Sequence, residues 1–186
     1  GGVTISGGEP LLQWRFTSEI LKECRGHGIH TCVETSLHAS ADIVRQVVPL
    51  ADMIITDIKH MDSVRHREYM GVGNETILAN IAEIAAGDIP LIIRVPVIPG
   101  HNDDDENIRA TAEFIAGRLK NRVRQVQLLP FRQLGIEKYA SLDREYPMDF
   151  FTPPPREIRE KNIRRIAELM QSYGIPASAG TSAKIV

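Results

Sequence analysis

Apolar residues in this chain gather in short runs, which alternate with stretches where they recur every three or four positions. Short apolar runs bounded by turn residues predict buried strands, and the wider spacing predicts helices with one apolar face. The predicted strands cover residues 1–6, 29–33, 53–58, 91–97 and 123–129. The predicted helices cover residues 12–24, 41–48, 76–86 and 105–119, and a last one carries Ile158, Ile166, Leu169 and Tyr173.

The order of these elements predicts one α/β domain of five consecutive βα units. Parallel strands need crossover helices and become buried, so the pattern indicates a parallel sheet covered by helices. A complete eight-unit barrel takes about 250 residues. The chain has 186, which favours a partial barrel or an open doubly wound sheet. We expect residues 1–179 to form the domain, residues 180–186 to be a loose tail, and the first strand to leave an exposed edge.

The first predicted helix shows the most regular apolar spacing. Its apolar positions fall on every fourth residue, at Leu12, Phe16, Ile20 and Cys24, and Gly26 and Gly28 follow. This spacing predicts that the four side chains form the buried face of the helix and that the glycines end it.

Composition and charge narrow the possible partners. The chain is 42% hydrophobic and 25% charged, which excludes disorder, collagen and coiled coil. Lys and Arg total 22 against 24 for Asp and Glu, so no basic field favours nucleic acid or anionic membranes. Two cysteines are too few for a disulfide framework, and no signal peptide or long apolar span is present in the sequence. We expect a cytoplasmic protein.

Ligands of parallel βα folds bind beyond the carboxyl ends of the strands, so the polar residues there are the candidates for a site. In chain order they are Ser6, Gly7, Gly8, Glu9, Glu34, Thr35, Ser36, Asp57, Lys59, Arg94 and Arg132. We expect all of them to lie on one rim of the sheet, with Glu9, Glu34, Lys59 and Arg94 around a common opening.

Two interpretations of the segment Gly7–Gly8–Glu9 stay open. Paired glycines let a backbone approach a ligand closely, and a carboxylate accepts hydrogen bonds from an ammonium group. Equally, a glutamate directly before Pro10 is typical of a helix start, where the helix dipole favours an acid. Residues 34–36 also fit an N-cap cluster.

Asp57 and Lys59 favour a site more strongly, with a structural ion pair as the alternative. Side chains two positions apart on a strand point the same way, so an acid and an ammonium group share one face. His60, Asp62 and His66 match no metal-ligand spacing, and their surroundings predict a solvated loop. The acidic residues 103–106 precede a predicted helix and favour capping. Both cysteines are expected to be buried and unreactive.

Five segments together resemble a known family. They read GGVTISGGEP at residues 1–10, TDIKHMD at 56–62, YMGVGN at 69–74, IRVPVIPG at 93–100 and LLPF at 128–131. As a set, in this order, they resemble the activating enzymes of glycyl radical enzymes, within the radical S-adenosylmethionine superfamily. The similarity covers nearly the whole chain.

The resemblance implies a (β/α)6 partial barrel, of which this chain holds about five units. It implies S-adenosylmethionine and a 4Fe-4S cluster as cofactors, and abstraction of hydrogen from a backbone glycine of a glycyl radical enzyme. It further implies an electron donor of the flavodoxin or ferredoxin type.

The resemblance also assigns roles by position. Gly7, Gly8 and Glu9 match the motif that holds the methionyl amino group. Glu34, Thr35 and Asp57 match residues near the cofactor or a monovalent cation. Lys59 and Arg94 match basic residues near the cofactor carboxylate and the peptide site. Arg132 stands where many members have a histidine that contacts adenosine.

The cluster motif of the family, Cys-x3-Cys-x2-Cys, normally precedes the position of Gly1. Cys24 and Cys32 do not replace it, because several thiolates hold such a cluster. We therefore expect the chain to be the carboxyl-terminal part of an activating enzyme, with no cofactor bound and no activity of its own.

Two other functions stay open. Asp57-x-Lys59-x-x-Asp62 also resembles the strand-end signature of the orotidine monophosphate decarboxylase group, whose barrels act on a carboxylate substrate without an iron–sulfur cofactor. Alternatively, the chain is a docking domain that binds a glycyl radical partner without chemistry. Protection by nucleoside monophosphates rather than S-adenosylmethionine would identify the first, and the gene sequence upstream of Gly1 would decide the second.

Overall fold

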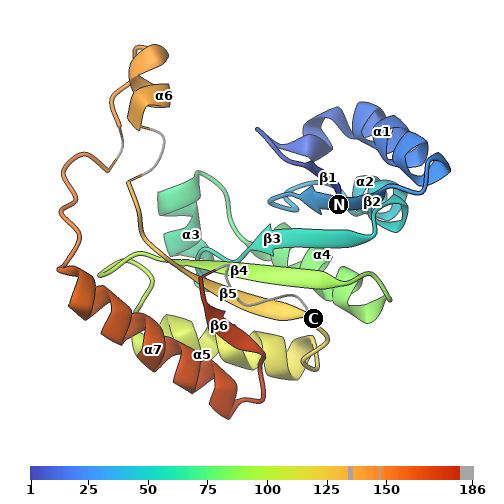
Figure 1. The fold of residues 1–186 in the computed structure, drawn as a ribbon. Helices are drawn as coiled ribbons and strands as arrows, with labels where there is room; N and C mark the ends of the chain where they lie inside the picture. Colours follow the sequence, from blue (N-terminus) through green and yellow to red (C-terminus); the bar gives the residue numbers. More distant parts are fainter. Residues whose placement is uncertain (134–135, 147, 181–186) are drawn as a thin grey trace.

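The computed structural model describes residues 1–133, 136–146 and 148–180 (Figure 1). Its centre is a parallel sheet with the strand order β1-β2-β3-β4-β5-β6. The strands are β1 (Gly2–Ile5), β2 (His30–Glu34), β3 (Met53–Asp57), β4 (Leu91–Val97), β5 (Gln125–Pro130) and β6 (Ala177–Ala179). The parallel sheet and its five predicted strands are confirmed, and the α/β fold is that of a partial barrel.

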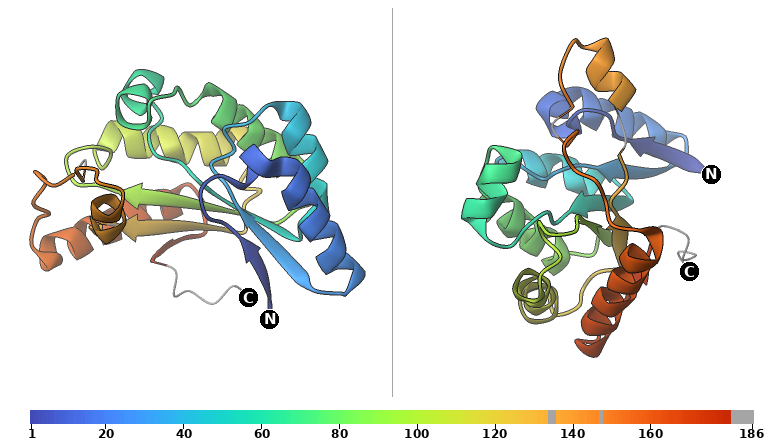
Figure 2. Two further views of the ribbon diagram at one scale, coloured as in Figure 1. Left: turned by 90° about the horizontal axis from the view of Figure 1, so that it is seen from above. Right: turned by 90° about the vertical axis from the view of Figure 1, so that its left-hand side faces the viewer.

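Most of the helices wrap around the outer side of the curved sheet, whereas α6 (Ile136–Ser141) projects away from it (Figure 1 and Figure 2). The helices are α1 (Trp14–Gly26), α2 (Ala41–Val47), α3 (Ser63–Met70), α4 (Glu75–Ala86), α5 (Asp105–Glu113), α6 (Ile136–Ser141) and α7 (Arg156–Ser172). Short helical turns cover Pro10–Gln13, Val48–Leu50 and Phe114–Arg118. Within the described ranges, no helix has both the length and the apolar character needed to cross a membrane.

The two faces of the sheet differ in chemistry. Side chains alternate between the faces of a strand. One set, which includes Val33, Ile54 and Ile93, is fully buried and joins the helices in a single core. Each such side chain contributes about 1.5–3 kcal/mol by its burial. The other set carries Glu34 and Arg94, so the inner face of the sheet is polar near its carboxyl end.

The prediction of which face of α1 is buried is wrong. Leu12 is 81% exposed and Phe16 is 65% exposed, whereas Thr17, Ser18 and Leu21 are buried. The turn Pro10–Gln13 sets the rotation of the helix, and the Thr17 hydroxyl donates to the carbonyl of Pro10 at 2.9 Å. Small polar side chains with internal hydrogen bonds therefore occupy the face that packs on the sheet.

The solvated loop predicted around His60, Asp62 and His66 is also wrong. The Asp62 carboxylate caps α3 by accepting from the amide of Arg65, and Gly71 ends this helix with φ at 80°. Both histidines are buried. The sequence prediction missed α3 because the helix is mostly polar and no apolar stripe marks its buried side.

The last strand, β6, was not predicted. It has three residues, all small, and it pairs in parallel with β5 through Val126↔Ala177 and Leu128↔Ala179. The expected loose tail begins with Gly180, whose amide donates to the carbonyl of Leu128 at 2.8 Å. Gly180 is therefore tied to the sheet, and residues 181–186 lie outside the described residues.

Candidate functional site

A hollow of about 440 Å³ lies at the carboxyl ends of β1, β2 and β3. It brings together nine of the eleven candidates named from the sequence, which are Ser6, Gly7, Gly8, Glu9, Glu34, Thr35, Ser36, Asp57 and Lys59. Neighbouring side chains complete the wall, among them the polar His38 and the apolar Met70, Val72 and Ile77. The predicted common rim therefore exists at this end of the sheet.

The turn after β1 presents backbone to the hollow. Gly7 has φ at 124°, a conformation that L side chains rarely adopt, so glycine is needed here. A Cβ atom at Gly7 or Gly8 would meet no atom within 4 Å, which means that open space lies over this turn. A ligand can therefore approach the peptide groups of this turn directly.

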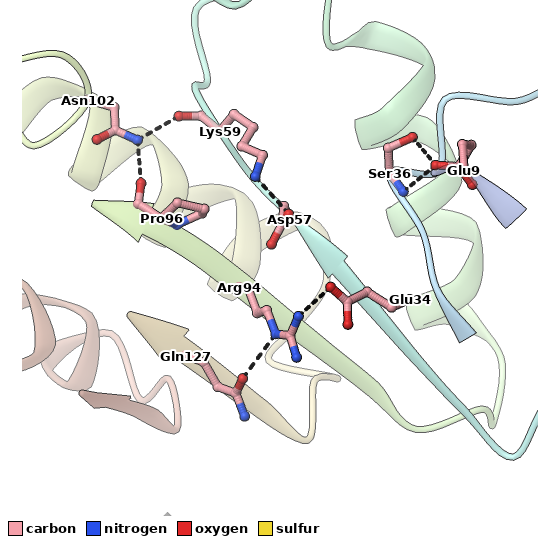
Figure 3. A network of polar contacts seen from close by, with 9 residues as sticks. All are labelled: Glu9, Glu34, Ser36, Asp57, Lys59, Arg94, Pro96, Asn102 and Gln127. Atoms are coloured by element: carbon pink, nitrogen blue, oxygen red, sulfur yellow. Dashed lines mark hydrogen bonds and ion pairs between the residues drawn. The ribbon is translucent and has the colours of Figure 1, made fainter. Parts of the chain in front are cut away.

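Glu9 is engaged by the protein itself. One carboxylate oxygen accepts from the Thr35 hydroxyl at 2.5 Å and the Leu11 amide at 3.1 Å. The other accepts from the amide and hydroxyl of Ser36 at 2.8 and 2.5 Å (Figure 3). Glu9 thus caps the turn Pro10–Gln13 and clamps the end of β1 to the end of β2.

Asp57 and Lys59 form an ion pair. The Lys59 Nζ atom lies 2.7 Å from Asp57 Oδ2, and the two side chains are 35% and 32% exposed (Figure 3). An ion pair that is one third exposed contributes little to stability, and either group remains reachable for a ligand of opposite charge. The shared face that the sequence predicted is confirmed, and the pair is oriented along the wall of the hollow.

Arg94 does not line the hollow but reaches its wall through Glu34. Arg94 Nη1 lies 2.6 Å from Glu34 Oε1, and Arg94 Nε donates to Gln127 Oε1 at 3.3 Å. In the sheet register, Arg94 lies beside Asp57 on one strand and beside Gln127 on the other. Glu9, Glu34, Lys59 and Arg94 therefore lie on one side of the molecule, as expected.

Arg132 lies elsewhere. It lines a second hollow of about 600 Å³ beside the ends of β5 and β6, together with Arg156, Arg159 and Arg164 of α7. Of the eleven candidates named from the sequence, ten are thus gathered around or next to the first hollow, and Arg132 is not among them.

Several residues that shape the rim were not singled out by the sequence. Asn102 is buried, and its side-chain amide donates to the carbonyls of Lys59 and Pro96 at 2.9 and 2.7 Å (Figure 3). It thereby holds the segment after β3 against the end of β4. Gln127 contacts Arg94 from the middle of β5. The one sequence signal for Gln127 is that it alternates with a second glutamine, Gln125, inside an otherwise apolar strand.

The cysteines take no part in the hollow. Cys32 is buried in β2, and this burial raises the pKa of its thiol, an effect that the nearby Glu34 strengthens and Arg94 opposes. Cys24 lies on α1. In the part of the chain that the structure describes, no group of three or more His, Cys, Asp or Glu side chains is arranged to hold a metal ion.

The decarboxylase alternative needs Asp57, Lys59 and Asp62 together. Asp62 instead caps α3 and lines a separate hollow with Arg65 and Asp104. The three residues therefore do not form one constellation.

Comparison with known proteins identifies the family. The model of the radical SAM superfamily, named for S-adenosylmethionine, matches residues 1–114. The chain belongs to the radical SAM superfamily. This match includes β1 to β4, and with them every residue of the first hollow. It agrees with the resemblance seen in the sequence.

Curated radical SAM relatives are activating enzymes. The chain is 44% identical over 184 residues to the (2S)-3-sulfopropanediol dehydratase activating enzyme of Klebsiella oxytoca, covering 99% of this chain and 58% of the relative. It is 39% identical over 182 residues to the 4-hydroxyphenylacetate decarboxylase activating enzyme of Clostridioides difficile, covering 97% and 55%. The chain thus spans little more than half the length of these relatives.

A solved structure supports the same assignment. A domain of pyruvate-formate lyase-activating enzyme from Bacteroides vulgatus superposes with a TM-score of 0.78 at 36% identity, covering 97% of this chain and 99% of that domain. The resemblance to the activating enzymes of glycyl radical enzymes is therefore confirmed, and the radical SAM core of this chain has the partial-barrel architecture.

The hollow suits the charged end of an amino-acid ligand. An ammonium group needs acceptors, which the peptide carbonyls of the glycine turn and the acids Glu34 and Asp57 offer. A carboxylate needs donors, which Lys59 offers within the hollow and Arg94 offers beside it, next to Glu34. The residues present thus fit the methionyl end of S-adenosylmethionine. They do not fit a 4Fe-4S cluster, because neither cysteine lines the hollow.

Proposed function

We propose that this chain is the part of a glycyl radical enzyme activating enzyme that holds the amino-acid end of S-adenosylmethionine. The observation that carries the proposal is the single hollow in which an open glycine turn, two acids and a lysine meet at the ends of three parallel strands. Opposite charges gathered on one rim suit a ligand that carries both an ammonium and a carboxylate group.

Each residue then has a defined task. The peptide groups at Gly7 and Gly8 receive the amino group, and Glu9 holds their turn in place, since its own oxygens already accept four hydrogen bonds. Lys59 and Arg94 bind the carboxylate. S-adenosylmethionine, when bound together with an iron–sulfur cluster, would supply the radical chemistry of this superfamily.

Further parts of the proposal rest on the family. A monovalent cation at Glu34, Thr35 and Asp57 and an adenosine contact by Arg132 stay predictions. The protein substrate is a glycyl radical enzyme, in keeping with the names of the relatives, and the electron comes from a donor of the flavodoxin or ferredoxin type. Such redox chemistry requires a reducing compartment, so we place the protein in the cytoplasm.

Calorimetric titration of the longest product of the gene tests the proposal. S-adenosylmethionine is expected to bind, and Lys59→Ala is expected to weaken binding about tenfold, or about 1.4 kcal/mol. Lys22→Ala, which removes an exposed lysine on α1, is the matched control and leaves the affinity unchanged. Absence of binding would contradict the proposal and favour a docking domain. Binding of nucleoside monophosphates in its place would favour the decarboxylase.

A further inference from the structure

A chain of side-chain hydrogen bonds runs from Arg94 across the inner face of the sheet to its last strand. Arg94 Nε donates to Gln127 Oε1 at 3.3 Å, and Gln127 Nε2 donates to Gln125 Oε1 at 3.0 Å. Gln125 Nε2 then donates to the Ser178 hydroxyl at 2.8 Å. Together with the Glu34 ion pair, the chain connects β2, β4, β5 and β6.

The donor and acceptor groups of these side chains allow the row of hydrogen bonds to run in one direction. A guanidinium group only donates hydrogen bonds, so Gln127 must turn its carbonyl oxygen toward Arg94. Its amide NH2 then faces Gln125, which must turn its own carbonyl toward Gln127 and its NH2 toward Ser178. The orientation of both amides therefore follows from the presence of the arginine. Gln127 cannot flip without losing both of its contacts, and Gln125 cannot flip without losing its contact with Gln127, although the Ser178 hydroxyl could then donate to it.

Because both glutamine side chains are buried, breaking these hydrogen bonds costs free energy. Gln127 is 4% exposed and Gln125 is 8% exposed, so neither amide has ready access to water. A buried polar group left without a partner costs about 1–3 kcal/mol. Gln127, held in turn by Gln125, hence fixes the Nε side of the Arg94 guanidinium, while Glu34 holds its Nη1 atom. Nη2 is the part of the guanidinium that the described residues do not engage.

We propose that Gln127 is a positioning residue that aims Arg94 at the carboxylate of the bound ligand, and that Gln125 and Ser178 hold Gln127 in the required orientation. This inference rests on the proposed function, in which Arg94 binds the carboxylate of S-adenosylmethionine. It gives β6, which the sequence did not predict, an indirect part in ligand binding.

Two ligands separate this role from a structural one. The longest gene product is titrated with S-adenosylmethionine and with its decarboxylated analogue, which keeps the ammonium and sulfonium groups. Gln127→Leu removes the acceptor at nearly constant volume. We expect it to weaken S-adenosylmethionine binding about tenfold and the analogue less than about twofold. Gln127→Glu keeps an acceptor for Arg94 and is expected to restore most of the affinity.

The loss of affinity should become smaller along the row of hydrogen bonds from Gln127 to Ser178, and it should require Arg94. Gln125→Leu is expected to weaken S-adenosylmethionine binding about threefold and Ser178→Ala less than about twofold. In an Arg94→Ala background, Gln127→Leu should add no further loss. Gln171→Leu is the matched control. This glutamine donates to the backbone carbonyl of Ala177 and takes no part in the hydrogen bonds from Arg94 to Ser178, so its loss should leave the ratio of the two affinities unchanged.

The outcomes distinguish the two proposals. If wild-type protein binds neither ligand, both the proposed function and the positioning role are overturned. If wild-type protein prefers S-adenosylmethionine and Gln127→Leu lowers both affinities equally, the positioning role is overturned while the proposed function stands. A loss confined to the carboxylate-bearing ligand, absent in the Arg94→Ala background, supports the positioning role.

Discussion

Two regions of the rim hold their charged side chains in different ways. At the corner formed by the ends of β1 and β2, both oxygens of Glu9 are occupied by donors from Thr35, Ser36 and Leu11. On the face formed by β4 and β5, Arg94 is held on one side by Gln127 and contacts Glu34 on the other.

This difference shows that a position on the rim does not by itself make a residue a ligand-binding group. A carboxylate that already accepts four hydrogen bonds serves mainly to hold two strand ends together. A guanidinium that is oriented but still has free donors is ready for a ligand. Substitutions in the corner should therefore lower stability, whereas substitutions on the β4–β5 face should chiefly lower affinity.

The largest effect is expected from Glu9→Ala. The change removes the acceptor of four hydrogen bonds and leaves the donors at the ends of β1 and β2 without their partner. Hydrogen bonds to a charged group contribute about 1.5–3 kcal/mol each, and partial exposure reduces their sum, so we expect a loss of about 3 kcal/mol. The free energy of unfolding in urea measures this loss.

Glu23→Ala is the control for removing a glutamate. Its side chain is 80% exposed and, among the described residues, pairs only with His27 at the C-cap of α1, so the expected change is less than about 0.5 kcal/mol. Equal, small losses in both variants would show that the corner does not hold the strand ends together.

Asp57→Asn is expected to lower the free energy of unfolding less than Glu9→Ala does. The size of this loss shows whether Asp57, on β3, acts with the structural corner or with the ligand-binding face. The ion pair with Lys59 is about one third exposed, so its loss should lower the unfolding free energy by less than about 1 kcal/mol. High salt should reduce the difference between wild type and variant, because screening weakens the pair. A loss as large as that of Glu9→Ala would place Asp57 in the structural corner.

Short-range patterns predicted the strands and the rim, because alternation, glycine turns and strand ends are read directly from neighbouring residues. The positions of Gly7, Glu34 and Lys59 at the strand ends follow from these local patterns alone. The rotation of α1 does not, since the exposed Leu12 and Phe16 form a regular stripe and the buried Thr17 and Ser18 are polar. Their internal hydrogen bonds decide the packing, and no spacing rule contains them.

Long-range contacts account for the other differences. β6 is three residues long and exists only because it pairs with β5, which lies about 50 positions earlier in the chain. Gln127 and Asn102 matter through partners on other strands and loops. The histidines predicted to be solvated are buried by α3, a helix whose sequence carries no apolar stripe.

The smallest expected effect is a pH dependence from His60, which lies in the segment after β3 between the two regions. Burial lowers the pKa of its imidazole, and the nearby Arg65 adds to this, while Asp104 and Asp62 oppose it. Its Nδ1 atom accepts from the Asp62 amide at 3.0 Å, and Nε2 has no hydrogen-bond partner among the described residues. The folded protein therefore favours the neutral ring.

The sign of the effect follows from this preference. Above the pKa of the unfolded chain, about 6.5, His60 is neutral in both states and costs no stability. As the pH falls below that value, the unfolded chain takes up the proton first, so the free energy of unfolding decreases until the folded-state pKa is passed. His60→Asn keeps an acceptor for the Asp62 amide but cannot titrate. Urea unfolding at about pH 7.5 and about pH 5.5 should therefore show a smaller loss in the variant than in wild type. Equal losses would mean that other groups carry the pH dependence and that the segment between the two regions tolerates a charged ring.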